Sequence, residues 1–326
     1  MPTKTKIYTP QKLRTLLKDK KWIMEYNTLY GIVDTTAKKV MYIENYGPPD
    51  GFFIEGWRAL HFPNTSPLVE KSYREGGSTI FILNEGKAEL NLVPSFAPIG
   101  IEECQVKNNE VRITIAGFGG GGVSASFSRG MAKGVKQVEV LDEGGGTKYG
   151  RGLLVLPAKS MLLIGIDDTD NNEEGATYSL AHNIATDIAK KYDVVYAIHN
   201  NIQLYPYNPS KTKNCMSTVI GFIYEDKRKR EKIVKEFAKQ LKKYTVSQET
   251  GMAVFDGFTI SEELAKVCLS IKYTLITDLE ALKDIATRNG VQLYTITGER
   301  GLIGAIAALG FYDNPELASK LPEKEK

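Results

Sequence analysis

Three carboxylates stand within four positions at the end of the apolar run MLLIGIDDTD, at Asp167, Asp168 and Asp170. Carboxylates this close repel one another, and each raises the pKa of its neighbours unless a cation neutralises them. Mg²⁺ is typically held by one or two carboxylates together with substrate phosphates. The cluster therefore predicts a metal site with Asp167, Asp168 and Asp170 as the ligands of Mg²⁺.

The segment that follows the acids offers a place for an anion. A helix is expected to begin near Ala176, and the free N–H groups at a helix start favour negative charge. Acids, metal and helix start together are typical of a nucleotide triphosphate site, so ATP and Mg²⁺ are the expected cofactors. The alternative is that Asp170 or Asn172 caps the helix and the other acids are turn residues.

The surrounding elements should hold the acids at the edge of a sheet. LLIGID is apolar on both faces, as in the central strand of a covered sheet, and ligands bind at the carboxyl end of such strands. Helices are expected over 176–191 and 228–244, with the strands VVYAIHN and MSTVIGFIY between them. Residues 22–157 instead contain short apolar runs separated by Gly, Pro and Asn, which is typical of β structure.

Composition restricts the class of protein. The 326 residues carry a net charge of +3, which is too small to indicate a nucleic-acid or membrane-surface protein. No apolar run reaches the roughly 18 residues that a membrane span requires, so a cytoplasmic protein without membrane partners is expected. Neither a zinc site nor a disulfide framework is suggested by the three widely spaced cysteines, Cys104, Cys215 and Cys268.

A glycine-rich segment, VRITIAGFGGGGVSASFSRG, is a second candidate site. Gly117, Gly119 and Gly122 match the dinucleotide fingerprint GxGxxG, and Glu139 follows at about the required distance. The strands before it are not interleaved with helices, however, and the Ser and Gly residues after it predict a poor helix. A dinucleotide site, a mobile loop whose amides close over the ATP phosphates, and a plain flexible connection remain open.

Several motifs together resemble a known family. IGIDDTD, the following helix with Thr177, the KTKN segment and RGLIGAIAALG are similar, over residues 161–311, to archaeal tRNA-Ile agmatinylcytidine synthetase. The full chain, with its β-rich half, resembles the methanogenesis marker protein 11 family. The synthetase resemblance implies ATP-dependent phosphoryl transfer that turns an oxygen into a leaving group before an amine attacks.

The resemblance also implies a domain organisation of mixed α+β and α/β class. We expect a β-rich N-terminal domain over 1–158, a kinase-like ATP-binding domain over 159–245, a ferredoxin-like domain over 246–312 and a disordered tail over 313–326. Asp167, Asp168 and Thr177 take catalytic positions. The expected nucleotide contacts are Asp170, Lys211, Thr212 and Asn214, with Gly117, Gly119 and Gly122 as the anion loop.

The resulting functional hypothesis is an ATP- and Mg²⁺-dependent phosphotransferase or ligase-like enzyme linked to methanogenesis, with an unknown small-molecule or protein acceptor. The alternative is a non-catalytic nucleotide-binding accessory of a methanogenesis protein complex. A tRNA-modifying enzyme ranks below both, and tRNA is not favoured as a partner, because the chain lacks the zinc ribbon and the carboxy-terminal extension with which the synthetase holds tRNA.

Overall fold

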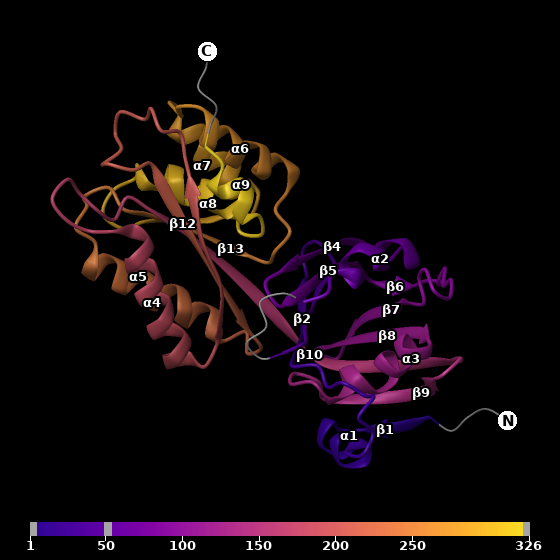
Figure 1. Ribbon diagram of the computed structural model, residues 1–326. Helices are drawn as coiled ribbons and strands as arrows, with labels where there is room; N and C mark the ends of the chain where they lie inside the picture. Colours follow the sequence, from indigo (N-terminus) through magenta and orange to yellow (C-terminus); the bar gives the residue numbers. More distant parts are fainter. Residues whose placement is uncertain (1–4, 49–53, 322–326) are drawn as a thin grey trace. The chain divides into compact units, whose positions relative to one another are not determined.

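The computed structural model describes residues 5–48 and 54–321 and has two compact units, Met1–Lys159 and Ser160–Lys326. Both units combine a sheet with helices, so the chain is a mixed α/β protein, as expected (Figure 1). Among the described residues, no helix has the length and apolar character needed to cross a membrane.

The strands of unit 1 pair mostly antiparallel, in two groups that are joined by a short parallel pairing of β2 with β10. One group runs β4-β5-β3-β2 and the other β1-β9-β10-β8-β7-β6. Leu13, Tyr42, Phe81 and Ile113 lie in its buried core. The elements are β1 (Lys6–Tyr8), α1 (Pro10–Leu17), β2 (Thr28–Asp34), β3 (Lys39–Asn45), α2 (Trp57–Thr65), β4 (Val69–Glu75), β5 (Ser78–Asn84), β6 (Gly86–Lys87), β7 (Ile99–Lys107), β8 (Glu110–Phe118), α3 (Gly119–Val123) and β9 (Gln137–Gly145).

The glycine-rich segment is helical, which corrects the expectation of a mobile loop. Helix α3 continues into a π-helical turn, Ser124–Ser128, and a 3₁₀ turn, Arg129–Met131. The glycines allow this helix to touch the sheet with its backbone, since a Cβ at Gly122 would lie 2.7 Å from the amide nitrogen of Gly150. Close packing therefore outweighs the poor helix propensity of glycine.

Strand β10 (Lys148–Asp167) is one continuous strand where the sequence predicted two. Its first part pairs with β8 and β9, and residues 160–167 pair with β12 (Met216–Tyr224) and β13 (Gly251–Asp256). Pro157 occupies the last position paired with β8, opposite Glu110, and does not end the strand. The strand continues beyond it and ends in the acid cluster.

Unit 2 contains one antiparallel sheet in the order β11-β12-β10-β13-β14. Leu162, Ile164 and Ile166 of β10 belong to the same buried cluster as residues of α4 and α5, whereas α8 packs on β12 and β13. The remaining elements are α4 (Thr177–Tyr192), β11 (Val195–Gln203), α5 (Lys229–Tyr244), α6 (Glu262–Tyr273), α7 (Leu279–Arg288), β14 (Gln292–Thr295), α8 (Gly301–Leu309) and α9 (Pro315–Ser319).

The expected subdivision at residue 245 does not coincide with a break in the sheet. Strand β13, from the predicted ferredoxin-like part, pairs directly with β10 from the predicted kinase-like part. The subdivision therefore stays a prediction. The tail is corrected in part: Pro315–Ser319 form α9, capped by the side chain of Asn314, and Ala318 is buried. Residues 322–326 lie outside the described residues.

Helix α8 packs closely on the sheet because glycines stand both on the strands and on the helix where the two meet. A Cβ at Gly165 would lie 1.9 Å from the carbonyl oxygen of Ala305, and one at Gly251 would lie 2.3 Å from the amide nitrogen of Leu302. On the helix, a Cβ at Gly301 would overlap the backbone of Gly251, and a Cβ at Gly304 would overlap the carboxyl group of Asp167. We call Gly165, Gly251, Gly301 and Gly304 the glycine seat.

Substitution of Gly165 by Ala is expected to destabilise unit 2 by about 3 kcal/mol, because the methyl group would overlap the Ala305 carbonyl and force α8 off the sheet. Urea unfolding of the full chain measures this. The exposed Ser179→Ala on α4 is the control and should change stability by about 0.5 kcal/mol or less. Equal stability of the two variants would contradict the tight seating of α8.

Candidate functional site

The acid cluster forms a tight turn at the end of β10. Asp168 has a φ of +60°, a conformation that non-glycine residues rarely adopt. The turn is fixed by its neighbours: Thr250 Oγ1 donates to the carbonyl oxygen of Asp168 at 2.7 Å, and the N–H of Val246 donates to that of Thr169 at 3.1 Å. Local strain held in this way is typical of functional sites.

Asp170 links the turn to two other segments. Its Oδ1 accepts from Thr177 Oγ1 at 3.2 Å, and its Oδ2 accepts from Thr212 Oγ1 at 3.0 Å. Thr177 is the first residue of α4, and the N-cap residue is Ala176, so neither Asp170 nor Asn172 caps this helix. Asp170 thus positions both the helix start and the KTKN segment.

Asp168 is paired with a cation that the sequence interpretation missed. Arg300 Nε donates to Asp168 Oδ2 at 2.8 Å, and Ser247 Oγ donates to Oδ1 at 3.1 Å. The hydrogen bond to Asp168 raises the pKa of Arg300, which stays charged. The backbone N–H of Arg300 donates to Glu249 Oε2 at 3.2 Å. In the sequence, Arg300 stands directly before the glycine that begins α8, but only the fold brings its side chain to the acids.

Asp167 lies against the glycine seat. A Cβ at Gly304 would stand 1.8 Å from Asp167 Oδ2, so only glycine leaves room for this carboxyl group. Burial raises the pKa of Asp167 well above its ordinary range, and the charges of Asp168 and Asp170 raise it further. A carboxyl group in this position favours either a proton or a bound cation.

The cluster lines a pocket within unit 2. Asp167, Asp168 and Asp170 share this pocket with Lys211, Thr212 and Asn214, so the structure brings together six of the predicted site residues. Thr177 is not in the lining but is hydrogen-bonded to Asp170. The other lining residues are Leu204, Tyr205, Asn208, Ser210, Cys215, Met216, Ile271, Thr274, Ile276, Arg300, Ile303 and Gly304.

The three acids do not form a three-carboxylate metal group. Over residues 5–48 and 54–321, no set of three or more His, Cys, Asp or Glu side chains is arranged to hold a metal ion. The carboxylate of Asp168 is engaged by Arg300 and Ser247. Asp167 and Asp170 remain as pocket carboxylates, and a metal role for them stays a prediction.

The predicted anion-loop glycines serve packing in unit 1. A Cβ at Gly117 would lie 2.6 Å from the carbonyl oxygen of Pro98, and Gly119 has a φ of +58° at the turn into α3. The strands on either side of α3, β8 and β9, both pair antiparallel with β10, unlike the parallel strands of a dinucleotide-binding unit. The role of Gly117, Gly119 and Gly122 toward ATP stays a prediction.

Cys215 and His199 are further side chains that could act as a nucleophile or a base, and neither is suited to that role here. Burial raises the pKa of Cys215 to about 11, so its thiol is protonated at neutral pH and is a poor nucleophile. His199 does not line the pocket but stacks on Tyr178, with ring centroids 3.8 Å apart. Burial lowers the pKa of His199, which favours its neutral form.

Comparison with known proteins gives one match over nearly the whole chain and further matches over part of it. A protein of Methanocaldococcus jannaschii described as uncharacterized is 40% identical over 305 residues, covering 93% of this chain and 99% of its own. The TiaS TCKD domain family matches residues 163–230. The tRNA 2-agmatinylcytidine synthetase TiaS of Methanosarcina acetivorans is 27% identical over 161 residues, covering 48% of this chain and 37% of the synthetase.

Solved structures of TiaS match the same share of the chain. A complex of TiaS with tRNA and ATP has a TM-score of 0.38 and 23% identity, and covers 46% of this chain and 36% of its own. Apo TiaS has a TM-score of 0.37 and 20% identity, with 46% and 35% covered. The chain therefore spans about a third of the length of these synthetases.

These matches correct two expectations. The relatives matched by the half that contains the acid cluster are named for tRNA modification, so it was wrong to rank a tRNA-modifying enzyme below the other functions. It was equally wrong to disfavour tRNA as a partner. The matches show similarity to TiaS and no link to methanogenesis, so neither the methanogenesis enzyme nor the accessory protein is retained.

Proposed function

The chain belongs to the family represented by the Methanocaldococcus jannaschii protein, and we propose that it is a TiaS-like, ATP-dependent enzyme that modifies an RNA. The observation that carries this proposal is the overlap between the TiaS TCKD match and the pocket. Residues 163–230 contain Asp167, Asp170 and the KTKN segment, which meet in the structure around one cavity.

The chemistry proposed is transfer of a phosphoryl group from ATP to an oxygen of an RNA nucleotide. A bond forms between that oxygen and phosphorus, the P–O bond of the donor breaks, and the departing nucleotide keeps the electron pair. Lys211 and Arg300 are the cationic side chains of the pocket and would contact phosphate oxygens. Thr212 and Asn214 supply polar groups that would orient the triphosphate.

The balance of charge in the pocket supports a divalent ion. Asp168 is paired with Arg300, so Lys211 is the cationic side chain left in the lining for Asp167 and Asp170, which would repel a triphosphate when both are ionised. Asp167 and Asp170 present the oxygen donors that Mg²⁺ prefers. They would hold the ion, which would neutralise phosphate charge during transfer. Arg300 is paired with Asp168 and would keep that carboxylate from competing with the phosphates.

The proposal predicts that the full chain consumes ATP in an RNA-dependent manner. Purified protein is incubated with ATP and total archaeal tRNA, and released nucleotide and phosphate are measured, with Mg²⁺ or with excess chelator. We expect turnover that tRNA stimulates several-fold and that chelator abolishes, because uncompensated carboxylates exclude the triphosphate. Turnover that is the same with and without tRNA would contradict an RNA acceptor. Turnover that excess chelator leaves unchanged would contradict the requirement for a divalent ion.

A further inference from the structure

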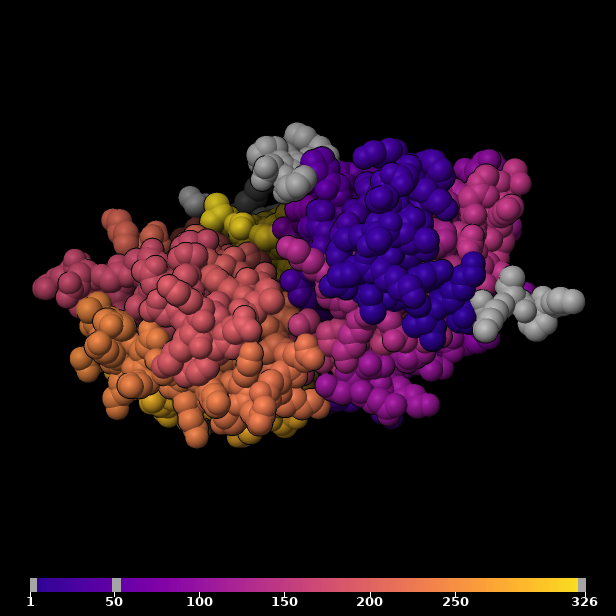
Figure 2. Space-filling model, turned by 90° about the horizontal axis from the view of Figure 1, so that it is seen from below, coloured from indigo at the N-terminus to yellow at the C-terminus, as the bar shows by residue number. Residues whose placement is uncertain are grey.

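Unit 1 contains a second pocket, far along the chain from the acid cluster, that the TiaS TCKD match does not reach. It measures about 390 Å³, within the range of small-molecule sites. The lining combines an N-terminal segment with the glycine-rich helix and the β9–β10 turn. Its members are Trp22, Met24, Tyr26, Arg58, Gly120, Val123, Ser124, Ser128, Gly145 and Gly146. Figure 2 shows indigo N-terminal residues beside magenta residues on one face of unit 1.

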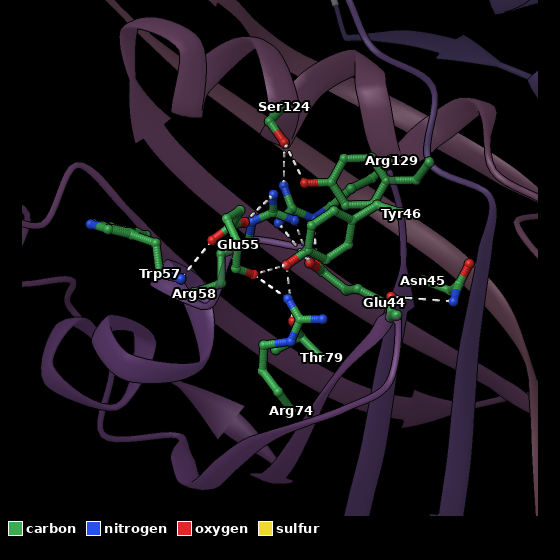
Figure 3. Close-up of polar contacts among 12 residues, drawn as sticks. Glu44, Asn45, Tyr46, Glu55, Trp57, Arg58, Arg74, Thr79, Ser124 and Arg129 are labelled. Atoms are coloured by element: carbon green, nitrogen blue, oxygen red, sulfur yellow. Dashed lines mark hydrogen bonds and ion pairs between the residues drawn. The ribbon is translucent and has the colours of Figure 1, made fainter. Parts of the chain in front are cut away.

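The polar wall of this pocket is supported by a buried charge network (Figure 3). Arg129 and Glu44 are both fully buried and form a two-point ion pair, with Arg129 Nη2 3.1 Å from Glu44 Oε2. Arg129 Nη1 also donates to Ser124 Oγ at 2.7 Å, and Tyr26 Oη lies 3.1 Å from the same oxygen. Ser124 and Tyr26 are thus held rigidly where they face the pocket.

Arg58 is a charged side chain of the pocket lining and is paired with two carboxylates, Glu44 and Glu55. Its guanidinium lies 3.8 Å above the ring of Tyr46 and 5.1 Å from that of Tyr26, and it contacts Glu44 at 3.3 Å. Its exposed partner is Glu55, 2.7 Å away. Among the described residues of the lining, Arg58 is the one charged side chain. A stacked, pre-oriented guanidinium of this kind is suited to phosphate oxygens and to the carbonyl edges of bases.

The rim and the opposite wall suit a flat ring and a backbone phosphate. Trp22 is 72% exposed and Met24 is 47% exposed, so both present apolar surface to solvent. A Cβ at Gly120 or Gly146 would meet no atom within 4 Å, so their backbone is open to an approaching group. Unpaired bases of RNA are recognised by stacking on aromatic rings, with arginine on the phosphate.

We propose that this pocket binds one unpaired nucleotide of an RNA, with the base stacked on Trp22 and the phosphate held by Arg58. The choice of RNA rests on the proposed function, whereas the ring-and-anion chemistry rests on the pocket itself. The β-rich half of the chain would therefore hold the RNA substrate.

Tryptophan fluorescence tests this site directly. The chain has two tryptophans, Trp22 and Trp57. Trp57 lies outside the pocket lining and stacks on His61 at 4.5 Å. In the full chain with Trp57→Phe, Trp22 is the one reporter. We expect a short single-stranded oligouridylate to quench its fluorescence, and UMP to do so more weakly. Inorganic phosphate, which has no ring to stack, should cause no quenching.

Two variants test whether Trp22 and Arg58 contact the RNA. Trp22→Ala should weaken oligouridylate binding about tenfold in fluorescence anisotropy, as expected for one lost stacking contact. Arg58→Lys keeps the charge but loses the planar fork, and should weaken binding similarly. Arg112→Lys is the matched control, because Arg112 pairs with Glu139 outside the pocket, and should bind as the wild type does.

The outcomes separate this inference from the proposed function. RNA-dependent ATP turnover with an unresponsive Trp22 would overturn the inference and leave the proposed function standing. Quenching by RNA without ATP turnover would support the site and count against the enzyme. Quenching by an acidic peptide but not by RNA would overturn the inference in favour of a protein partner. Unchanged RNA binding by both Trp22→Ala and Arg58→Lys would overturn the assignment of the RNA contact to this pocket.

Discussion

Substitution of Asp167 by Asn is expected to lower ATP turnover by about 10²–10³-fold, the cost of removing one electrostatic group from a catalytic site. The same change should stabilise the protein in the absence of ATP. Burial raises the pKa of Asp167, so the folded chain keeps this proton to higher pH than the unfolded chain does. Stability is therefore lost as the pH rises from about 4 through the raised pKa. The Asp167→Asn protein lacks this loss.

Two measurements check this prediction: phosphate release with saturating ATP, and thermal unfolding at pH 5 and pH 8 without nucleotide. The variant should melt higher than the wild type at pH 8, with a smaller difference at pH 5. Asp284→Asn, the same substitution at an exposed position of α7, is the control and should change neither quantity. Full activity of Asp167→Asn would remove this residue from the proposed site.

Substitution of Arg129 by Met is expected to destabilise unit 1 by about 3 kcal/mol, because it leaves the carboxylate of Glu44 buried without its main partner. Both side chains of this pair are fully buried, and Arg129 lowers the pKa of Glu44 against the cost of burial. The loss should lie at the lower end of the range for broken buried pairs, since Arg58 Nη1 remains 3.3 Å from Glu44.

Urea unfolding of the full chain measures the effect, and the double variant Glu44→Gln/Arg129→Met should recover part of it. Arg112→Met provides a comparison at a partly exposed ion pair with Glu139 and should cost about 1 kcal/mol or less. A loss for Arg129→Met no greater than for Arg112→Met would show that the buried pair contributes little to stability.

The sequence predicted the acid turn because the signal is local. An apolar strand, three acids and a helix start follow one another within about twenty residues, and each has a recognisable pattern. Arg300 could not be found in this way. It lies 132 positions from Asp168, and the two meet only because β13 pairs with β10 and α8 packs on that sheet.

In the glycine-rich segment, a strong local sequence pattern led to a wrong structural expectation, because the segment is helical. Four successive glycines favoured a mobile loop or a flexible connection over a regular helix, because each glycine adds conformational freedom to an isolated chain. In the fold, that freedom is outweighed by packing: Gly122 and Gly150 bring a helix and strand β10 into backbone contact. Propensity describes the segment alone and cannot include the surface against which it packs.

The glycine seat suggests how the history of this half of the protein could be read. Gly165, Gly251 and Gly301 come from three separate stretches of sequence, and each is required because a backbone atom lies where its side chain would stand. Gly304 instead leaves room for the carboxyl group of Asp167. A descendant that had lost catalysis could replace its aspartates, and Gly304 with them, yet it would still need the other three glycines to keep α8 in place. These three positions are therefore required independently of activity. Searching with them could recover lineages in which the acids themselves have been lost.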